Sequence, residues 1–236
     1  MTSHVRFVVA DVEQSGEGRR VASAAMGQMS LFSAGAREPM LVDLEGLLAG
    51  PGQVVRRGES ARVSVVVTTG WRADALAAEM TSLGVEAQTE PADPANPGGQ
   101  SVTVRTPWLT ELLEVANRWT LGAVKVPPAG WVLDGGRLRW WCLSAGSGPE
   151  AGQPAMYTLA LGASDEPAWG AVGAALAAAG IAGVLVGPRA DGPAYRIVGQ
   201  RRLARLRELV GEAPDGVPAQ AWPPGPLDAV QPQGET

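Results

Sequence analysis

The alternation of apolar and polar positions predicts one series of elements twice along the chain. A strand is predicted over 63–67 and again over 157–161, because alternate residues there are apolar. Each strand is followed by a helix, over 72–83 and over 167–179, whose apolar residues recur on one face. The pattern therefore indicates two related halves.

The elements that follow also recur. A glycine ends each predicted helix, at Gly84 and at Gly180, where a left-handed C-terminal cap suits a residue without a β-carbon. Two strands joined by a turn rich in Pro, Gly and Asp come next, and a last apolar-faced helix closes each half. The strands are expected over 85–89 and 101–105, then over 181–186 and 194–198, and the last helices carry Leu109, Leu112 and Ala116, then Leu203, Leu206 and Leu209.

A short apolar segment that ends in glycine opens each half. It runs from Leu44 to Gly52 (LEGLLAGPG) in the first half and from Ala129 to Gly136 (AGWVLDGG) in the second, and strand-like residues follow each segment. The unit is therefore helix, strand, strand, helix, strand, strand, helix, present twice. The expected divisions are an N-terminal strand and approach segment over 1–39, a first repeat over 40–127, a second repeat over 128–222, and an acidic tail rich in Pro and Gly, expected to be disordered, over 223–236.

The LEGLLAGPG segment resembles the signature helix of the LAGLIDADG homing endonucleases and their non-catalytic relatives, through Leu44, Gly46, Leu47 and Gly52. The resemblance implies an α+β fold with an internally duplicated αββαββα unit. In that family two signature helices pack side by side between two saddle-shaped antiparallel sheets, related by a pseudo-two-fold axis, and the sheets lie on DNA. An acid near the end of each signature helix binds a divalent metal.

In this chain the two metal-binding acid positions fall on Pro51 and Gly135, neither of which has a side-chain oxygen. Phosphodiester hydrolysis by metal ions needs carboxylates that hold those ions, so we expect no metal site, no catalytic residue and no nuclease activity. A metal-dependent DNA endonuclease stays open as an alternative only if Asp134 converges with an acid such as Asp43 or Glu45.

Arginine supplies all but one of the basic residues, and the way the arginines cluster suggests a binding surface. On a strand predicted around 138–140, Arg137, Arg139 and Trp141 would share one face, with Trp141 exposed, and such a face can lie along a phosphate backbone. Two interpretations stay open. One is a catalytically inactive DNA-binding protein whose role could be regulatory, as in the bacterial sporulation regulators that contain a degenerate domain of this kind; the other is a protein-interaction scaffold that uses the same surface. The candidate surface consists of Arg56, Arg57, Arg62, Arg105, Arg137, Arg139, Trp141 and Arg196.

Composition excludes several other classes. The net charge is −5, but residues 1–211 hold nineteen basic and twenty acidic residues, so most of the acidic excess lies in residues 212–236. Cys142 and His4 are the only cysteine and histidine, which excludes a disulfide framework, a zinc site of the usual ligands and a histidine-based triad. With no phosphate loop and no dinucleotide fingerprint, no cofactor and no nucleotide are expected.

Two further features bear on location. Residues 168–187 carry no charge, but Gly180 divides them into a predicted helix and strand, so a buried element is favoured over a membrane span. The chain opens without the pattern of a secretion signal, so the cytoplasm is the expected compartment.

Overall fold

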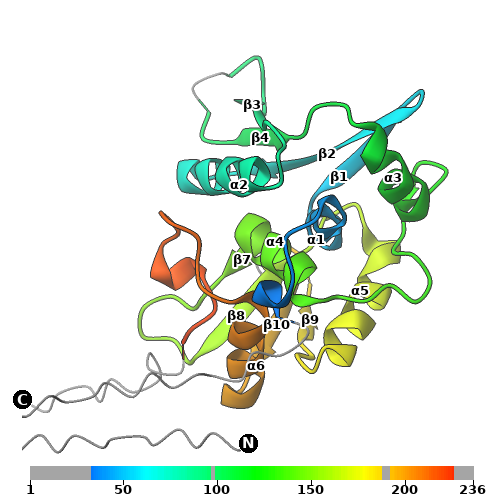
Figure 1. Cartoon of the computed structure of the whole chain (residues 1–236). Coiled ribbons are helices and arrows are strands. Elements are labelled where there is room, and N and C mark those ends of the chain that lie inside the picture. The colour runs from blue at the N-terminus through cyan, green and yellow to red at the C-terminus, as the bar shows by residue number, and fades with distance from the viewer. Residues whose placement is uncertain (1–32, 97–98, 188–191, 226–236) are drawn as a thin grey trace, which may run out of the picture.

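Two four-stranded antiparallel sheets with equivalent strand orders form the fold in the computed structural model, which describes residues 33–96, 99–187 and 192–225. The first sheet has the order β1-β2-β4-β3 and the second the order β7-β8-β10-β9. In Figure 1 the first sheet lies in the upper part of the molecule, the second in the lower part, and helices α1 and α4 lie between them. The topology confirms the duplicated α+β architecture expected from the sequence.

The first half contains short 3-10 helices, the central helix α1, one four-stranded sheet and the two-stranded sheet β5-β6, and the second half repeats the central helix and the four-stranded sheet around α4. Its elements are η1 (Ala34–Ala36), η2 (Leu41–Leu44), α1 (Glu45–Ala49), β1 (Gln53–Arg57), β2 (Ser60–Val67), α2 (Gly70–Ser82), β3 (Gln88–Pro91), β4 (Val102–Arg105), η3 (Thr110–Leu112), α3 (Leu113–Trp119), β5 (Thr120–Leu121) and β6 (Val124–Lys125). The second half contains α4 (Gly135–Ala145), β7 (Gly146–Ser147), β8 (Met156–Ala160), α5 (Glu166–Ala178), β9 (Val184–Val186), β10 (Ala194–Val198), α6 (Gln200–Val210) and η4 (Ala219–Ala221).

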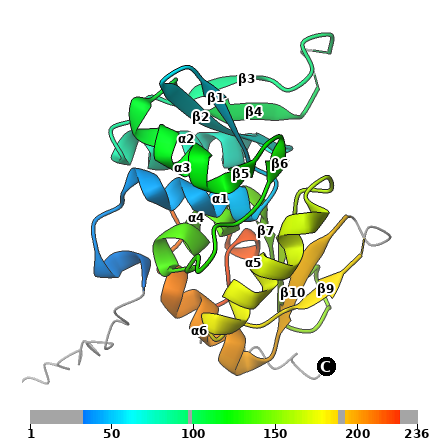
Figure 2. The same cartoon turned by 90° about the vertical axis from the view of Figure 1, so that its right-hand side faces the viewer.

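Helices α1 and α4 pack side by side at the centre of the molecule (Figure 2). Their backbones approach most closely at Gly46, where an added β-carbon would lie 1.7 Å from the carbonyl oxygen of Arg137. Gly50, at the end of α1, lies against the side chain of Trp141 in the same way, with an added β-carbon 2.7 Å from the indole. Only glycine allows an approach this close, which explains Gly46 and Gly50 in the first apolar segment.

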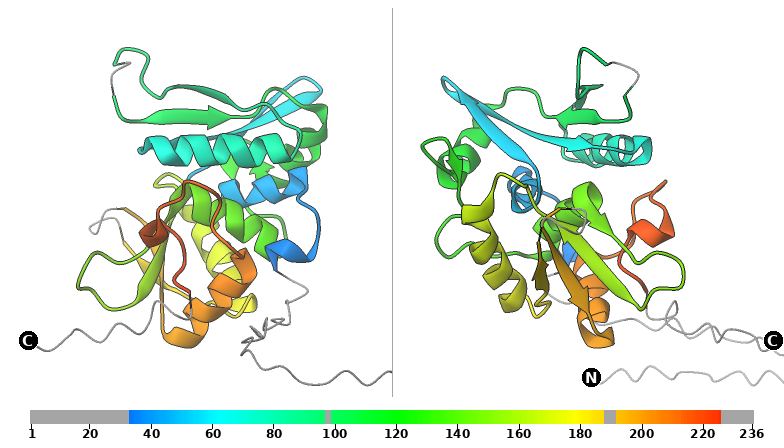
Figure 3. Two further views of the ribbon diagram at one scale, coloured as in Figure 1. Left: turned by 60° about the vertical axis from the view of Figure 1, so that its left-hand side comes forward. Right: turned by 180° about the vertical axis from the view of Figure 1, so that it is seen from behind.

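Strand alternation places one face of each sheet in the core. In β2, Ala61, Val63, Val65 and Val67 are buried, and the residues between them point away from the core. Helices α2 and α3 cover this buried face of the first sheet, and α2 runs along it in both views of Figure 3. In the second sheet Tyr157 and Leu159 of β8 and Tyr195 and Ile197 of β10 face the core in the same alternation.

Several sequence-based predictions are confirmed in detail. Strand β10 has the bounds predicted for it, and the uncharged run 168–187 divides into α5 and β9 as expected. The glycines after α2 and α5 have left-handed backbones, with φ of 74° at Gly84 and 81° at Gly180. Among the described residues, no helix combines the length and the apolar character needed to cross a membrane.

The prediction for residues 129–141 is wrong. The segment from Ala129 to Leu133 forms no helix, and Gly135 and Gly136 begin α4 instead of ending a helix. Asp134 is the N-cap of α4, and its carboxylate accepts a hydrogen bond from the backbone N–H of Arg137 at 3.0 Å. The residues expected on a strand therefore lie on a central helix. The predicted N-terminal strand, which residues 5–12 would form within the first segment, and the tail beyond residue 225 lie outside the described residues.

Candidate nucleic-acid interface

Three arginines lie on the outward face of the first sheet, which is the face opposite the helices. In the antiparallel register Arg62 pairs with Val55, Ser60 pairs with Arg57, and Ser64 pairs with Arg105. Because Val63 and Val65 of β2 point into the core, these neighbouring positions point outward. The sheet thus brings Arg57, Arg62 and Arg105 together on one surface, as the sequence predicted for them.

Trp108 completes this surface. After β4, the chain continues beside β2, with paired hydrogen bonds of 2.9 and 3.0 Å between the backbones of Ala61 and Leu109. The guanidinium carbons of Arg57 and Arg62 lie 4.2 and 4.6 Å from the centroid of the Trp108 ring. Within the described part of the chain, neither arginine forms an ion pair, so the indole is the group that holds both of them. We call Arg57, Arg62 and Trp108 the Arg-Trp cluster.

The sequence before Trp108 is typical of a helix start, with Thr106 as an N-cap and Pro107 in the first turn. This pattern predicts a helix at Trp108, but the 3-10 helix η3 starts only at Thr110. Thr106 instead stays next to β2, where its hydroxyl accepts a hydrogen bond from the N–H of Val63 at 3.2 Å. Simple alternation from Arg105 would turn residue 108 inward. The bridge between Ala61 and Leu109 shifts the register by one residue, and this shift places the indole on the outward face.

Arg105 is held at the other side of the sheet by two residues of the end strand β3. Its Nη2 donates to Glu90 Oε2 at 2.8 Å, its Nη1 forms an ion pair with the same carboxylate, and its Nε donates to Gln88 Oε1 at 3.3 Å. The charge of Arg105 is therefore largely balanced, and the uncompensated charge of this face lies in the Arg-Trp cluster.

Arg56 points to the other side of the sheet. It pairs with the buried Ala61 in the register, and its Nη1 donates to Asn117 Oδ1 of α3 at 2.8 Å. The structure therefore separates Arg56 from Arg57, although both side chains are exposed and adjacent in sequence.

The outward face of the second sheet differs from that of the first. Arg196 lies opposite Thr158 and Val184, and it is the one charged residue among the outward positions of the described strands. Within the described residues the Nε of Arg196 is buried and has no hydrogen-bond partner. The outward positions of this sheet are Ser147, Met156, Thr158, Ala160, Val184, Val186, Ala194, Arg196 and Val198.

The other three predicted surface residues do not lie on a sheet, because 135–145 is a helix. Trp141 is fully buried, and its Nε1 donates to the carbonyl of Ala160 at 2.8 Å, so its predicted exposure is wrong. Arg139 forms an ion pair with Glu79 at 2.9 Å and donates to the carbonyls of Val210 and Glu212. Arg137 is bound within the interior network of carboxylates described next.

Three carboxylates converge at the N-terminal ends of α1 and α4, but arginines hold them together. Glu45 is fully buried and accepts from Arg137 Nε at 2.8 Å and from the indole of Trp131 at 3.0 Å, and it forms an ion pair with Arg118. Asp134 accepts from Arg137 at 2.8 Å and from Arg37 at 3.1 Å, and Arg37 also binds Asp43. Both Asp43 and Asp134 raise the pKa of the Arg37 guanidinium, and the hydrogen bond to Asp43 has the larger effect.

The convergence of Asp43, Glu45 and Asp134 therefore has the composition of an internal salt-bridge network. Arg37 binds both Asp43 and Asp134, and Arg137 binds both Glu45 and Asp134, so the carboxylate oxygens accept from guanidinium N–H groups. In the part of the chain that the structure describes, no group of three or more His, Cys, Asp or Glu residues is arranged to hold a metal ion.

At the C-terminal ends of the two helices the structure places cations. Lys125 Nζ donates to the carbonyls of Gly50 and Gly52 at 2.7 and 2.8 Å, on either side of Pro51, and forms an ion pair with Asp165 at 2.6 Å. Burial lowers the pKa of Lys125, and the hydrogen bond that its ammonium group donates to Asp165 opposes that shift. A cation at this end of a helix is also favoured by the helix dipole.

Arg72 occupies the matching place beside α4. Its Nη1 donates to the carbonyl of Leu143 at 2.6 Å, its Nη2 donates to the carbonyl of Gly146, and burial lowers its pKa. The sequence placed the second metal-binding acid position on Gly135. That assignment is wrong, because Gly135 begins α4 and the acid position lies near the end of a signature helix. Counted from the last helical residue, Ser147 is the counterpart of Pro51. Neither residue carries a carboxylate.

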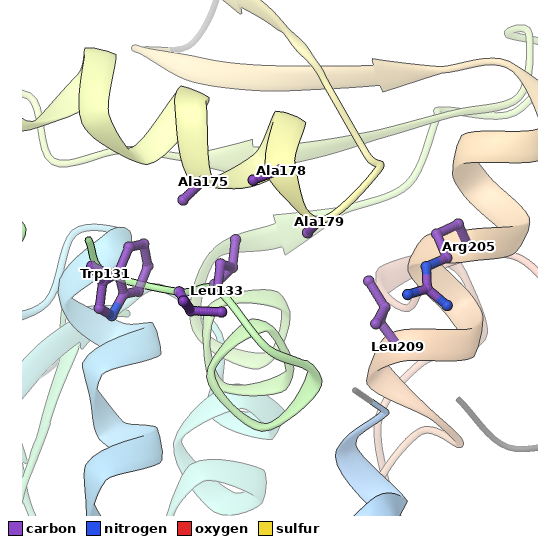
Figure 4. Close-up of a pocket in the computed structure, with 8 residues that line it drawn as sticks. Trp131, Leu133, Ala175, Ala178, Ala179, Arg205 and Leu209 are labelled. Carbon is purple, nitrogen blue, oxygen red and sulfur yellow. The ribbon is translucent and has the colours of Figure 1, made fainter. Parts of the chain in front are cut away.

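A separate pocket of about 300 Å³ lies between α5, α6 and the segment that leads into α4 (Figure 4). Alanine side chains of α5 line one wall, Trp131 and Leu133 line a second, and Leu209 and Arg205 of α6 line a third. Arg205 is the one charged residue of the lining, and it forms an ion pair with Glu208 at 2.9 Å. The pocket is apolar and contains no pair of acid and base groups.

Comparison with known proteins finds similarity in structure only. No protein-family model matches the sequence, and no curated protein matches it. The N-terminal LAGLIDADG domain of DUF199/WhiA has 12% sequence identity and a TM-score of 0.49, and the match covers 74% of this chain and 81% of that one.

The homing endonuclease I-WcaI, in a structure bound to its DNA recognition sequence, has 10% identity and a TM-score of 0.52 over 78% of this chain and 83% of that one. At such low identity the match concerns the path of the backbone. It agrees with the two equivalent sheets and with the pair of central helices that meet at Gly46. The chain therefore has a LAGLIDADG-like fold, with both copies of the unit in one polypeptide.

Proposed function

We propose that this chain binds duplex DNA through the outward face of the first sheet, and that it does so without cleaving the DNA. The observation that carries the proposal is the Arg-Trp cluster, in which two guanidiniums without carboxylate partners among the described residues stack on one indole. Guanidinium groups on a sheet surface suit hydrogen bonding to phosphate oxygens, and stacking restricts their motion before binding occurs.

The charge of this face supports the proposal although the chain is acidic overall. Its outward strand positions carry Arg57, Arg62 and Arg105 against Glu90 alone. Binding to phosphates depends on the local potential, which a net charge of −5 over the whole chain does not describe. The second sheet adds only Arg196, so we expect the first repeat to make most of the phosphate contacts.

The absence of cleavage is supported by the ends of the central helices. Pro51 and Ser147 have no carboxylate, and the carbonyls beside them bind Lys125 and Arg72. A divalent ion at either helix end would meet a cation and no acid from that end, and Asp165, beside Lys125, is already paired with its ammonium group. The carboxylates at the opposite helix ends are occupied by arginines.

The test is the salt dependence of binding, measured by fluorescence anisotropy with a labelled random-sequence duplex. With about three phosphate contacts, the logarithm of the association constant should fall with the logarithm of salt concentration with a slope of about −2.7. The double variant Arg57→Ala/Arg62→Ala should reduce that slope by about 2. Arg201→Ala/Arg202→Ala removes the same charge from exposed positions of α6, which packs on the other side of the second sheet, and should leave the slope unchanged.

Two results would overturn the proposal. Equal effects of the two double variants would show that the binding follows net charge alone, and an absence of binding at low salt would remove DNA as the ligand. Nicking of supercoiled plasmid by the wild-type chain in magnesium would contradict the second half of the proposal.

The second candidate is a protein-interaction scaffold. It is supported by the outward face of the second sheet, where Val184 is 63% exposed and Val198 is 40% exposed. An exposed face of small and apolar residues with one arginine fits a protein partner better than a phosphate backbone. If the chain shows no DNA binding in the anisotropy experiment, the protein-interaction scaffold becomes the favoured function.

A further inference from the structure

The end strands β3 and β9 occupy equivalent places in the two sheets. In the first sheet Gln88 of β3 lies opposite Arg105, and in the second Val184 of β9 lies opposite Arg196. Gln88, Thr89 and Glu90 of the first repeat thus correspond to Val184, Leu185 and Val186 of the second. The same structural position is polar in one repeat and entirely apolar in the other.

This difference concerns how a sheet edge is protected. An end strand offers unpaired N–H and C=O groups to any other strand, and proteins block such edges with charged residues and proline. Strand β3 has Glu90 and Pro91. Strand β9 has neither, its residues Val184 and Leu185 are 63% and 46% exposed, and it is the outermost strand of its sheet (Figure 2).

We propose that β9 pairs with β9 of a second copy of this chain, in antiparallel orientation, so that the two second sheets join across a two-fold axis. The proposal does not depend on DNA binding. It assigns the exposed apolar edge to an interface in which the same strand is used by both partners.

Strand β9 is complementary to itself in this arrangement. Pairing centred on Leu185 places Leu185 opposite its copy and places Val184 opposite Val186 of the partner. Since successive side chains alternate between faces, the valines meet on the outward face and the leucines meet on the inner side. An unrelated strand would have to supply the same uncharged sequence, whereas a second copy supplies it by symmetry.

Charge does not oppose the pairing. Arg196 is the one charged residue on the outward face, and it lies one strand inside the edge. The Arg196 residues of two copies would be three strand spacings apart, or about 14 Å, which exceeds the Debye length of about 8 Å at physiological salt. In the first sheet, Glu90 would lie directly at the corresponding junction.

The experiment is sedimentation equilibrium of the full chain over a range of concentrations. We expect a reversible dimer whose dissociation constant rises about tenfold or more in the double variant Val184→Gln/Val186→Glu, which copies the edge of β3. Val66→Glu is the matched control: Val66 is an exposed valine of an interior strand, and this change should leave the dimer unaffected.

Hydrogen exchange supplies a second measurement on the unmodified chain. The amides of residues 184–186 should become more protected as the concentration rises, and the amides of 88–90 should not. A chain that stays monomeric at the highest concentration would overturn the proposal. So would a dimer that the double variant leaves intact, and so would protection of β9 that is independent of concentration, which would indicate that the chain's own residues cover the edge.

Discussion

The substitution Gly46→Ala should separate the two central helices. A β-carbon at this position would lie 1.7 Å from the carbonyl oxygen of Arg137, 2.6 Å from its carbonyl carbon and 3.0 Å from its Cα. These atoms belong to α4, so no side-chain rotation can relieve the overlap. The backbones would have to move until a distance of 1.7 Å became more than 3.0 Å.

Such a movement has a substantial energetic cost. Overpacking a core by one methyl group costs about 1–3 kcal/mol, and more where rigid backbone must move. We therefore expect Gly46→Ala to lower the free energy of unfolding by about 3 kcal/mol or more, from a total of roughly 5–15 kcal/mol for a folded domain.

Gly170 offers a matched control. It lies within α5, it is exposed, and nothing would approach an added β-carbon within 4 Å. Alanine there should raise the free energy of unfolding by about 0.5–1 kcal/mol, because alanine is the better helix former. The same change, in two helices of one chain, thus has opposite expected signs.

Urea unfolding followed by circular dichroism measures both variants. The wild type and the two variants should show similar dependence on urea, so the midpoints give the differences directly. If Gly46→Ala unfolds within about 0.5 kcal/mol of the wild type, or if Gly170→Ala destabilises the chain equally, the close approach of α1 and α4 is refuted.

Two further predictions concern buried groups. Glu45→Ala should lower the free energy of unfolding, measured in urea, by about 3–5 kcal/mol, because it leaves Arg137, which is 15% exposed, without its buried carboxylate. Glu45→Met together with Arg137→Met should lower it much less. A double variant that loses the sum of the single effects would contradict this expectation. Burial raises the pKa of the Cys142 thiol from 9.0 to about 12, so the folded chain keeps a proton that the unfolded chain loses as the pH rises. Relative to Cys142→Ala, the free energy of unfolding should therefore fall by about 1.4 kcal/mol per pH unit between pH 9 and 11. The measurement is urea unfolding of both proteins across that range, and parallel pH profiles would show that the thiol is not the cause.

The sequence was sufficient to predict elements whose residues alternate or recur with one buried face. Strand β2 alternates regularly, and α6 places Leu203, Leu206 and Leu209 on a single buried stripe. Both patterns arise because one side of the element faces the core and the other faces solvent.

Helix α4 could not be recognised by the same reasoning, since it has no exposed face of its own. Leu138, Trp140, Trp141, Cys142 and Leu143 are all buried, so the sequence shows no helical period. The signal that remained was Asp134, whose carboxylate caps the helix. Its meaning was obscured by Gly135 and Gly136, which suggested the end of a helix although they lie at its start.

The candidate site was predicted in part for a related reason. Arg57, Arg62 and Arg105 lie on strands whose alternation places them outward, as expected. Arg137 and Arg139 depend on α4, and their assignment to a surface failed with it. The roles of Lys125 and Arg72 could not be inferred from sequence, because each binds carbonyl groups far away in the chain.

The position of Lys125 also limits how this chain could acquire a metal site. An acid introduced in place of Pro51 would stand between the two carbonyls that bind the ammonium group, and it would form an internal ion pair there before any divalent ion could enter. A metal site would also require the removal of the chain's only lysine and of Arg72, each of which anchors one helix end. Each removal would leave helix-end carbonyls without their donors, so the gain of chelation would lower the stability of the fold.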